Sequence, residues 1–221
     1  MDKNYIIVKN AISKEMADIC YKYFLLKRET FIVRRKAKYI SPFNFDEGTW
    51  EDGQVNNAYS LYGDILFDSL LEKIRPVMED NTNMKLMPTY SYARIYNKGN
   101  VLTKHKDRSS CEISTTLNLG GDPWPIYVEP DSTKGLFNEN NNTYVPSDSK
   151  GIQIDLEPGD MLIYKGSEIE HWRNALMGDH CAQLFLHYIT AKEENLPLLM
   201  DERPLLGLPK WFKGYKISNV E

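Results

Sequence analysis

The chain has 221 residues, of which 42% are hydrophobic and 26% charged, and its formal net charge is −4 at pH 7. This length predicts one globular domain with a sizeable core, and the mild acidity gives no reason to expect a nucleic-acid or anionic-membrane partner. The apolar runs are too short to cross a bilayer or to act as a signal peptide. Three widely spaced cysteines argue against a disulfide framework, so we expect a reduced, cytoplasmic protein.

Residues 1–85 predict a helical and loop-rich support region. A short strand is expected at residues 5–8 (YIIV), and a helix begins after Ser13, because serine is a favourable N-cap and apolar residues follow at helical spacing. A second helix is predicted over residues 61–78. Pro76 should break or kink its end, since proline cannot donate a backbone hydrogen bond.

Two stretches between these helices, residues 27–38 and 41–57, can each be interpreted in two ways. Residues 27–38 alternate basic side chains with Phe-Ile-Val, which favours a solvated edge strand; the alternative is a surface for an anionic substrate or partner. Residues 41–57 are rich in turn-forming residues and predict a loop. This loop is either a plain surface loop or a cover over an active site.

After Pro88 the pattern changes to short segments that alternate apolar and polar residues. Two loops, GGDPWP and NENNNTY, separate some of these segments. So many short strands predict a sandwich or open barrel with a core at residues 86–190, and residues 191–221 should pack back on it. The fold class is mainly β with flanking helices, in one domain over residues 1–221. The predicted strands are TYSYARIYN, CEISTTLNL, GIQIDL, DMLIYKG and AQLFLHYIT.

A candidate metal site combines His105, Asp107 and the distant His171. A spacing of two residues places side chains on the same face of a strand, and we expect Asp107 at the start of the CEISTTLNL strand. A jelly roll brings distant strands together at its open end, where the third ligand can join. Two imidazoles and one carboxylate bind Fe(II) and leave other positions open. Zinc is the main alternative, although no HExxH motif is present. We interpret His180 and His187 as ordinary hydrogen-bonded residues.

The motifs around these residues resemble the Fe(II)- and 2-oxoglutarate-dependent oxygenases, and most of all their prolyl-4-hydroxylase branch. The similar motifs are ARIYNKGNVLTKHKD, STTLNLGG, LEPGDMLIYKG and EHW, within residues 87–190. The resemblance implies a double-stranded β-helix of the jelly-roll or cupin type, with Fe(II) held by His105, Asp107 and His171. It also implies 2-oxoglutarate and O₂ as co-substrates, with ascorbate as an optional reductant. Such an enzyme hydroxylates an unactivated C–H bond and releases succinate and CO₂.

The same resemblance implies two polar contacts to 2-oxoglutarate. Tyr96 lies nine residues before His105, where prolyl hydroxylases of the family place a tyrosine that hydrogen-bonds this co-substrate. Thr116 falls on the strand where related enzymes point a polar side chain at the same ligand.

One departure from the family concerns the distal carboxylate of 2-oxoglutarate. The family usually has Lys or Arg nine to twelve residues after the second histidine, but residues 180–183 read His-Cys-Ala-Gln. A buried carboxylate needs a charged partner or several hydrogen bonds. Arg173 is the first candidate, because its planar guanidinium suits bidentate carboxylate binding. Lys165 is the second candidate, and Gln183 would add a neutral hydrogen bond.

No motif identifies the substrate or the oligomeric state. The resemblance favours peptidyl or free proline, while another protein side chain or a small metabolite fits the same residues. Two other classes of function stay open. One is a non-catalytic jelly-roll module that keeps the metal as a structural site, and the other is a cupin-type metalloenzyme that does not use 2-oxoglutarate. Iron-dependent turnover of 2-oxoglutarate separates them.

Overall fold

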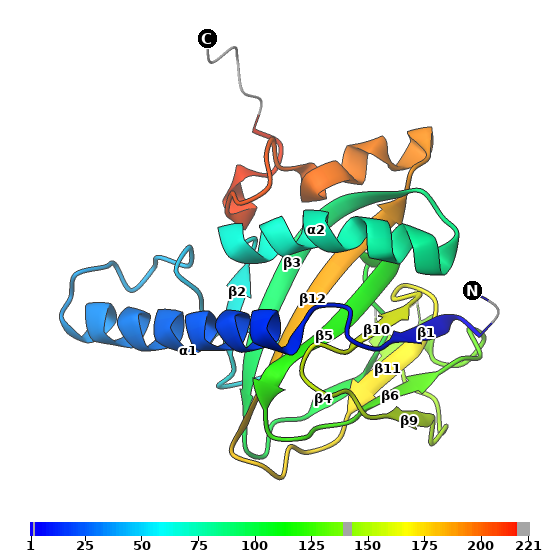
Figure 1. Cartoon of the computed structure of the whole chain (residues 1–221), viewed down its shortest axis with the longest axis horizontal. Coiled ribbons are helices and arrows are strands. Elements are labelled where there is room, and N and C mark those ends of the chain that lie inside the picture. Colours follow the sequence, from blue (N-terminus) through cyan, green and yellow to red (C-terminus); the bar gives the residue numbers. More distant parts are fainter. Residues whose placement is uncertain (2, 139–142, 216–221) are drawn as a thin grey trace.

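The computed structural model describes residues 1, 3–138 and 143–215, and in it two antiparallel β-sheets enclose the interior of the domain (Figure 1). The larger sheet has the strand order β1-β10-β5-β12-β3-β2, and the smaller one has the order β4-β11-β6-β9. Helices α1 and α2 lie across the outer face of the larger sheet. This arrangement confirms the predicted fold class, a mainly β jelly roll with flanking helices.

The helices are α1 (Lys14–Lys36) and α2 (Ile65–Thr82), with short 3-10 segments η1 (Ser109–Cys111), η2 (Glu193–Glu202) and η3 (Lys210–Phe212). The strands are β1 (Tyr5–Val8), β2 (Tyr59–Tyr62), β3 (Leu86–Asn97), β4 (Leu102–His105), β5 (Ile113–Gly121), β6 (Ile126–Glu129), β7 (Leu136–Asn138), β8 (Thr143–Val145), β9 (Ile152–Ile154), β10 (Met161–Tyr164), β11 (Glu170–Arg173) and β12 (His180–Thr190). The β7–β8 pair takes up both ends of the predicted NENNNTY loop, at residue 138 and residues 143–144, and residues 139–142 lie outside the described part of the chain. No described helix is long and apolar enough to span a membrane.

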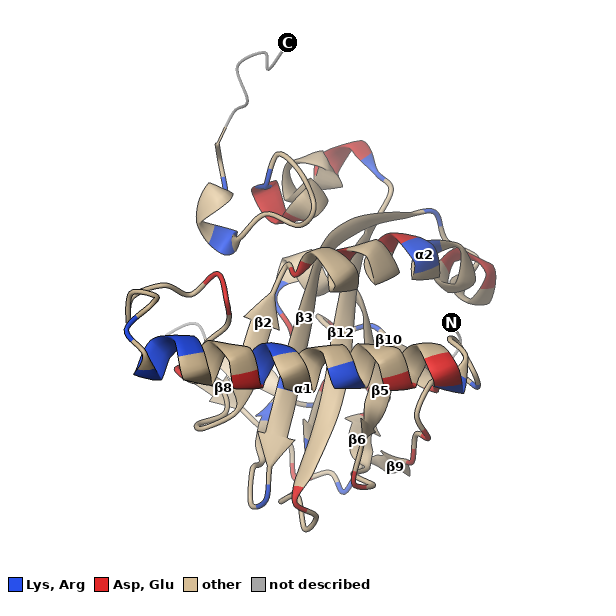
Figure 2. Cartoon of the chain, turned by 60° about the vertical axis from the view of Figure 1, so that its left-hand side comes forward, with Lys and Arg blue, Asp and Glu red and all other residues tan. Residues whose placement is uncertain are grey.

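Helix α1 begins as predicted but extends further. The Ser13 Oγ accepts a hydrogen bond from the Met16 amide, which confirms Ser13 as the N-cap. The predicted edge strand at residues 27–38 is wrong, because the helix continues to Lys36 and buries Phe31 against the sheet core. The basic side chains gather at the C-terminal end of α1 (Figure 2), where cations interact favourably with the helix dipole.

The predicted boundaries of the second helix, residues 61–78, are shifted toward the C-terminus in the structure. The first of these residues belong to β2, and α2 runs past Pro76 to Thr82. Ile74 and Met78, on either side of the proline, are both buried in the core under the larger sheet. Packing of this face outweighs the one backbone hydrogen bond that the proline cannot make.

The strands of the larger sheet turn alternate side chains to two environments. One set packs under α1 and α2, for example Leu184 and Leu186 on β12. The other set faces the space between the two sheets. Most of the polar side chains buried in the larger sheet belong to this second set, so the interior is where chemistry can take place. The inward-facing set, polar and apolar, includes Tyr92, Arg94 and Tyr96 on β3, Ser114 and Thr116 on β5, Tyr164 on β10, and Gln183, Phe185 and His187 on β12.

The C-terminal segment is anchored to α2 and β3 by a buried ion pair. Arg203 Nη1 lies 3.1 Å from Asp68 Oδ2, and both side chains are almost fully buried. The other oxygen of Asp68 accepts hydrogen bonds from the amide and the hydroxyl of Ser91. The Gly207 amide also donates to Asp68, at 2.7 Å. These contacts hold the described part of the predicted C-terminal extension, while residues 216–221 lie outside it.

Replacing Asp68 should expose how much this anchor stabilises the domain. Asp68→Ala leaves the Arg203 guanidinium buried without a counter-charge, so we expect the free energy of unfolding to fall by ~3–5 kcal/mol in urea denaturation. Asp80→Ala, an exposed aspartate on the same helix, is the control and should change stability by no more than ~0.5 kcal/mol. Equal effects of the two substitutions would contradict the anchor.

Candidate metal centre

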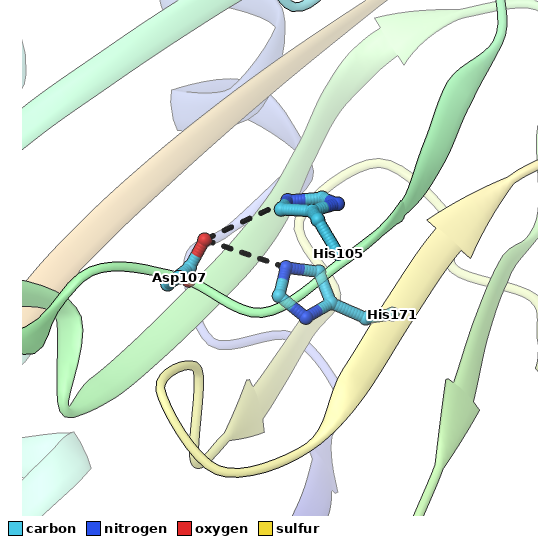
Figure 3. Close-up of side chains that lie close together, drawn as sticks. All are labelled: His105, Asp107 and His171. Atoms are coloured by element: carbon cyan, nitrogen blue, oxygen red, sulfur yellow. Dashed lines mark ion pairs between the residues drawn. The ribbon is translucent and has the colours of Figure 1, made fainter. Parts of the chain in front are cut away.

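The three predicted ligands come together on one wall of the interior (Figure 3). His105 ends β4, and His171 lies directly opposite it on the neighbouring strand β11. The Nε2 atoms of His105 and His171 lie 3.6 and 3.5 Å from Asp107 Oδ1. All three ligand atoms lie within 4.8 Å of one another, so they can hold one metal ion.

Backbone carbonyls set the tautomer of both imidazoles. His105 Nδ1 lies 2.8 Å from the Thr103 carbonyl oxygen, and His171 Nδ1 lies 3.1 Å from that of Ile169. A carbonyl oxygen only accepts, so each Nδ1 carries a proton and donates it. In the neutral ring, Nε2 then keeps its lone pair, and in both histidines this atom faces the Asp107 carboxylate. That is the orientation and tautomer of a metal ligand.

Asp107 reaches the site from irregular structure, so the prediction that places it at the start of a strand is wrong. It lies between β4 and η1, and its amide donates to the Gly166 carbonyl at 2.8 Å. The Ser114 hydroxyl donates to Asp107 Oδ2 at 2.9 Å. These two bonds turn Oδ1 toward the histidines without help from strand geometry.

His187 supports this carboxylate indirectly, a role that the sequence did not reveal. Its Nδ1 lies 2.9 Å from Ser114 Oγ. The other two partners of Ser114 Oγ, the Asp107 carboxylate and the Cys111 carbonyl oxygen at 3.1 Å, only accept and take its single hydrogen, so His187 is the donor in this pair. The ring is buried on the cavity wall, two residues along β12 from Phe185. Residues two apart on a strand share a face, so this spacing on the predicted strand was the sequence signal for the inward position of His187.

The electrostatics of the site favour the forms that bind a metal. Burial and the neighbouring charge of His171 lower the pKa of His105 to about 4. Burial alone would raise the pKa of Asp107, but the charges of His171, His187 and His105, together with hydrogen bonding, hold it well below its usual value. At neutral pH the site therefore offers a neutral His105 and an ionised Asp107, as metal coordination requires.

A cavity of about 340 Å³ opens over the three ligands. Arg94 on β3 lines it and forms a buried ion pair with Asp52, from the loop predicted at residues 41–57. The Tyr92 hydroxyl donates to the same carboxylate, and Gln54 accepts from Arg94. The loop therefore contributes to the cavity wall. Sequence reasoning missed Arg94 and Asp52, because their pairing joins segments about forty residues apart.

Three of the residues proposed for 2-oxoglutarate form a second polar group in the interior. Arg173 Nη2 donates to Thr116 Oγ1 at 3.1 Å and to Gln183 Oε1 at 3.0 Å. Nη1 donates to the carbonyl of Trp124, while Nε has no partner. Burial lowers the pKa of Arg173, and no carboxylate of the described residues acts on it. A fully buried guanidinium thus has only neutral oxygens as hydrogen-bond partners, and its carbon lies 4.9 Å from the centre of the Trp124 ring.

The remaining two candidates lie differently. Tyr96 is buried in the interior, where its hydroxyl accepts a hydrogen bond from Arg94 Nη1 at 3.0 Å. Lys165 does not join the group, and its candidacy as the counter-charge is not supported by the structure. Tyr164 takes the inward-facing position at the end of β10, so the next residue points outward, and the Lys165 ammonium pairs with Glu168 at 3.2 Å.

No family model and no curated protein sequence matches this chain. Solved structures do match. The epimerase SnoN, in complex with Fe³⁺ and α-ketoglutarate, aligns with a TM-score of 0.62 and 10% identity over 85% of this chain and 79% of SnoN. The fold is that of the 2-oxoglutarate-dependent oxygenases. A prolyl-4-hydroxylase from Pseudomonas putida has a TM-score of 0.53 and 13% identity, covering 84% of this chain and 91% of that one. HygX from Streptomyces hygroscopicus, with nickel and 2-oxoglutarate bound, has a TM-score of 0.52 and 13% identity, with 84% and 82% covered.

Gly166 leaves room for the Asp107 carboxylate, so a larger residue at this position tests the placement of Asp107 in the site. A Cβ atom there would lie under 3.0 Å from Asp107 Oδ2, Ser114 Oγ and the Cys111 carbonyl oxygen. We expect Gly166→Ala to lower Fe(II) affinity by roughly 10–100-fold in an anaerobic titration. Gly53→Ala is the control, because a Cβ there meets nothing within 4 Å. Wild-type affinity in Gly166→Ala would show that Asp107 is placed wrongly.

His187 predicts a pH dependence of stability. Burial lowers its pKa to about 4 in the folded protein, below the value of about 6.5 expected in the unfolded chain. As the pH falls, the unfolded state takes up the proton first, so this contribution is complete above pH 6.5 and is lost toward pH 4. The loss amounts to roughly 3 kcal/mol. We expect His187→Gln to flatten the pH dependence of the unfolding free energy of the metal-free protein between pH 7 and 4.5. An unchanged slope would contradict a neutral, buried His187.

Proposed function

We propose that this chain is an Fe(II)- and 2-oxoglutarate-dependent dioxygenase that hydroxylates an unactivated C–H bond. The observation that carries the proposal is the set of His105, Asp107 and His171 on a cavity wall of an oxygenase fold. Three ligands on one face of a metal leave positions open for a co-substrate and O₂. Among proteins with this fold, SnoN and HygX bind Fe³⁺ or nickel together with the keto acid, which supports the same pair of ligands here.

The metal and the keto acid, when bound, supply the oxidation: one atom of O₂ enters the substrate C–H bond, and the other enters succinate as CO₂ leaves. The chain contributes the placement of these groups. Asp107 is fixed by Ser114 and Gly166, and each histidine by its Nδ1–H bond to a carbonyl. The cavity, closed behind by the two sheets, limits access of water to the reacting groups.

Arg173 supports 2-oxoglutarate as the co-substrate. It lies two residues from His171 on β11, roughly 6.5 Å along the strand at 3.3 Å per residue. 2-Oxoglutarate carries a carboxylate at each end of a five-carbon chain, so it can bridge a metal held by His171 and the guanidinium. A carboxylate there would give the buried cation its missing counter-charge. Thr116 and Gln183 hold the guanidinium in place from β5 and β12.

The substrate that we propose is a proline, peptidyl or free. The similarity to the Pseudomonas putida prolyl-4-hydroxylase supports it at the level of the fold, together with the motifs near the metal ligands. We also propose a cytoplasmic location and no nucleic-acid partner. Three buried, free cysteines suit a reducing compartment.

Anaerobic addition of Fe(II) and 2-oxoglutarate to the metal-free protein tests the function. A keto acid that chelates Fe(II) gives a weak visible charge-transfer band, which we expect in the wild type and not in His171→Ala. Succinate should then form when O₂ is admitted with a substrate. Metal binding without the band would instead support a cupin-type metalloenzyme or a non-catalytic module.

The same band measures the role of Arg173. We expect Arg173→Gln to raise the dissociation constant for 2-oxoglutarate by ~30-fold or more, because it removes one partner of a buried charge pair. Fe(II) affinity should stay within about twofold, since the metal ligands are intact. Lys165→Gln removes the same charge outside the interior and should leave both constants unchanged. A larger effect of Lys165→Gln would transfer the counter-charge to that residue.

A further inference from the structure

A second cavity of about 420 Å³ adjoins the metal cavity. Asp52 and Tyr92 belong to the walls of both and are hydrogen-bonded to each other, so the two cavities meet at this pair of side chains. The rest of the second cavity comes from Tyr62 on β2 and from two distant segments, residues 45–53 and residues 209–211. The indole of Trp211 donates to Asp46 at 2.8 Å and joins these segments. We call this second cavity the outer groove.

The outer groove combines aromatic rings with carboxylates. Phe45 and Trp211 are 54% and 67% exposed, so both rings are accessible at the wall of the groove. Glu51 has no ion-pair partner among the described residues, and Asp46 makes hydrogen bonds but no described ion pair. Lys210 is the one cation among the wall residues of the described groove. Aromatic faces next to carboxylates bind a Lys or Arg side chain through cation–π contact and charge together.

We propose that the outer groove binds a basic side chain of a polypeptide substrate, while a neighbouring residue of that polypeptide enters the metal cavity. The proposal rests on the function proposed above and narrows its substrate from a free amino acid to an extended chain. A free amino acid in the metal cavity would leave the outer groove without a ligand, whereas an extended chain passes Asp52 and Tyr92 and occupies both.

Charge decides between a basic and an acidic flanking residue. The Asp52 carboxylate is already neutralised by Arg94, so it adds little to the field of the outer groove. Glu51 and Asp46 then face a single lysine, Lys210. The balance is negative and favours a cation, and the attraction should weaken with added salt because the groove is open to solvent.

A random dodecapeptide display library can be selected, without oxygen, on the protein loaded with Fe(II) and 2-oxoglutarate. The selection tests the proposed basic ligand of the outer groove without assuming which residue of the peptide reacts. We expect Lys and Arg to be enriched among the selected peptides. A synthetic peptide from the selection should bind about fivefold more weakly to Glu51→Gln, the effect of one exposed carboxylate–cation contact. Trp211→Ala should weaken it as well.

Glu15→Gln is the matched control, because it removes the same charge from an exposed position on α1. It should bind the peptide like the wild type. Selected peptides without basic enrichment, or with only apolar residues enriched, would overturn the cationic ligand. Turnover of a free amino acid with no peptide selected would overturn the polypeptide substrate. The charge-transfer band should persist in Glu51→Gln, so failure of this proposal is distinguishable from failure of the oxygenase assignment.

Discussion

Successive side chains of a β-strand point to opposite faces, and this constraint connects the core of the protein to its site. On β12, Leu184 and Leu186 pack under the helices, while Gln183 and His187 face the interior. A slip of one residue would put the leucines into the cavity and the polar groups into the apolar core. Packing of α1 and α2 on the sheet therefore fixes the strand register, and the register fixes which side chains meet around the metal ligands.

The interior contains several buried charges, and each has a different form of compensation. Arg94 pairs with Asp52 from the loop after α1. Asp107 is stabilised by Ser114 and by the histidines beside it. Among the described residues, Arg173 has only neutral oxygens as hydrogen-bond partners, together with a cation–π contact to Trp124. A buried cation without a counter-charge is unfavourable. An anion bound beside Arg173 should therefore make the folded domain more stable than it is without the anion. This argument favours an anionic ligand independently of any similarity between folds.

The sequence predicted the parts of the structure that depend on local pattern. Alternating segments predicted the main strands of the jelly roll, and the rare histidines allowed a short list of metal ligands. The conformation of residues 27–38 could not be predicted in this way, because burial of Phe31 against the sheet outweighs the strand preference of the Phe-Ile-Val stretch. The position of Asp107 depends on contacts with Gly166 and Ser114 that no local pattern encodes.

The placement of Arg173 and Gln183 shows why a sequence window alone could not locate the cation of the interior. The family pattern expects a cation at residues 180–183, and this chain has Gln183 there, facing the interior from β12. Arg173 on β11 reaches the same place and contacts Gln183 directly, at 3.0 Å. A carboxylate ligand responds to the charge and hydrogen bonds around it, whichever strand supplies them.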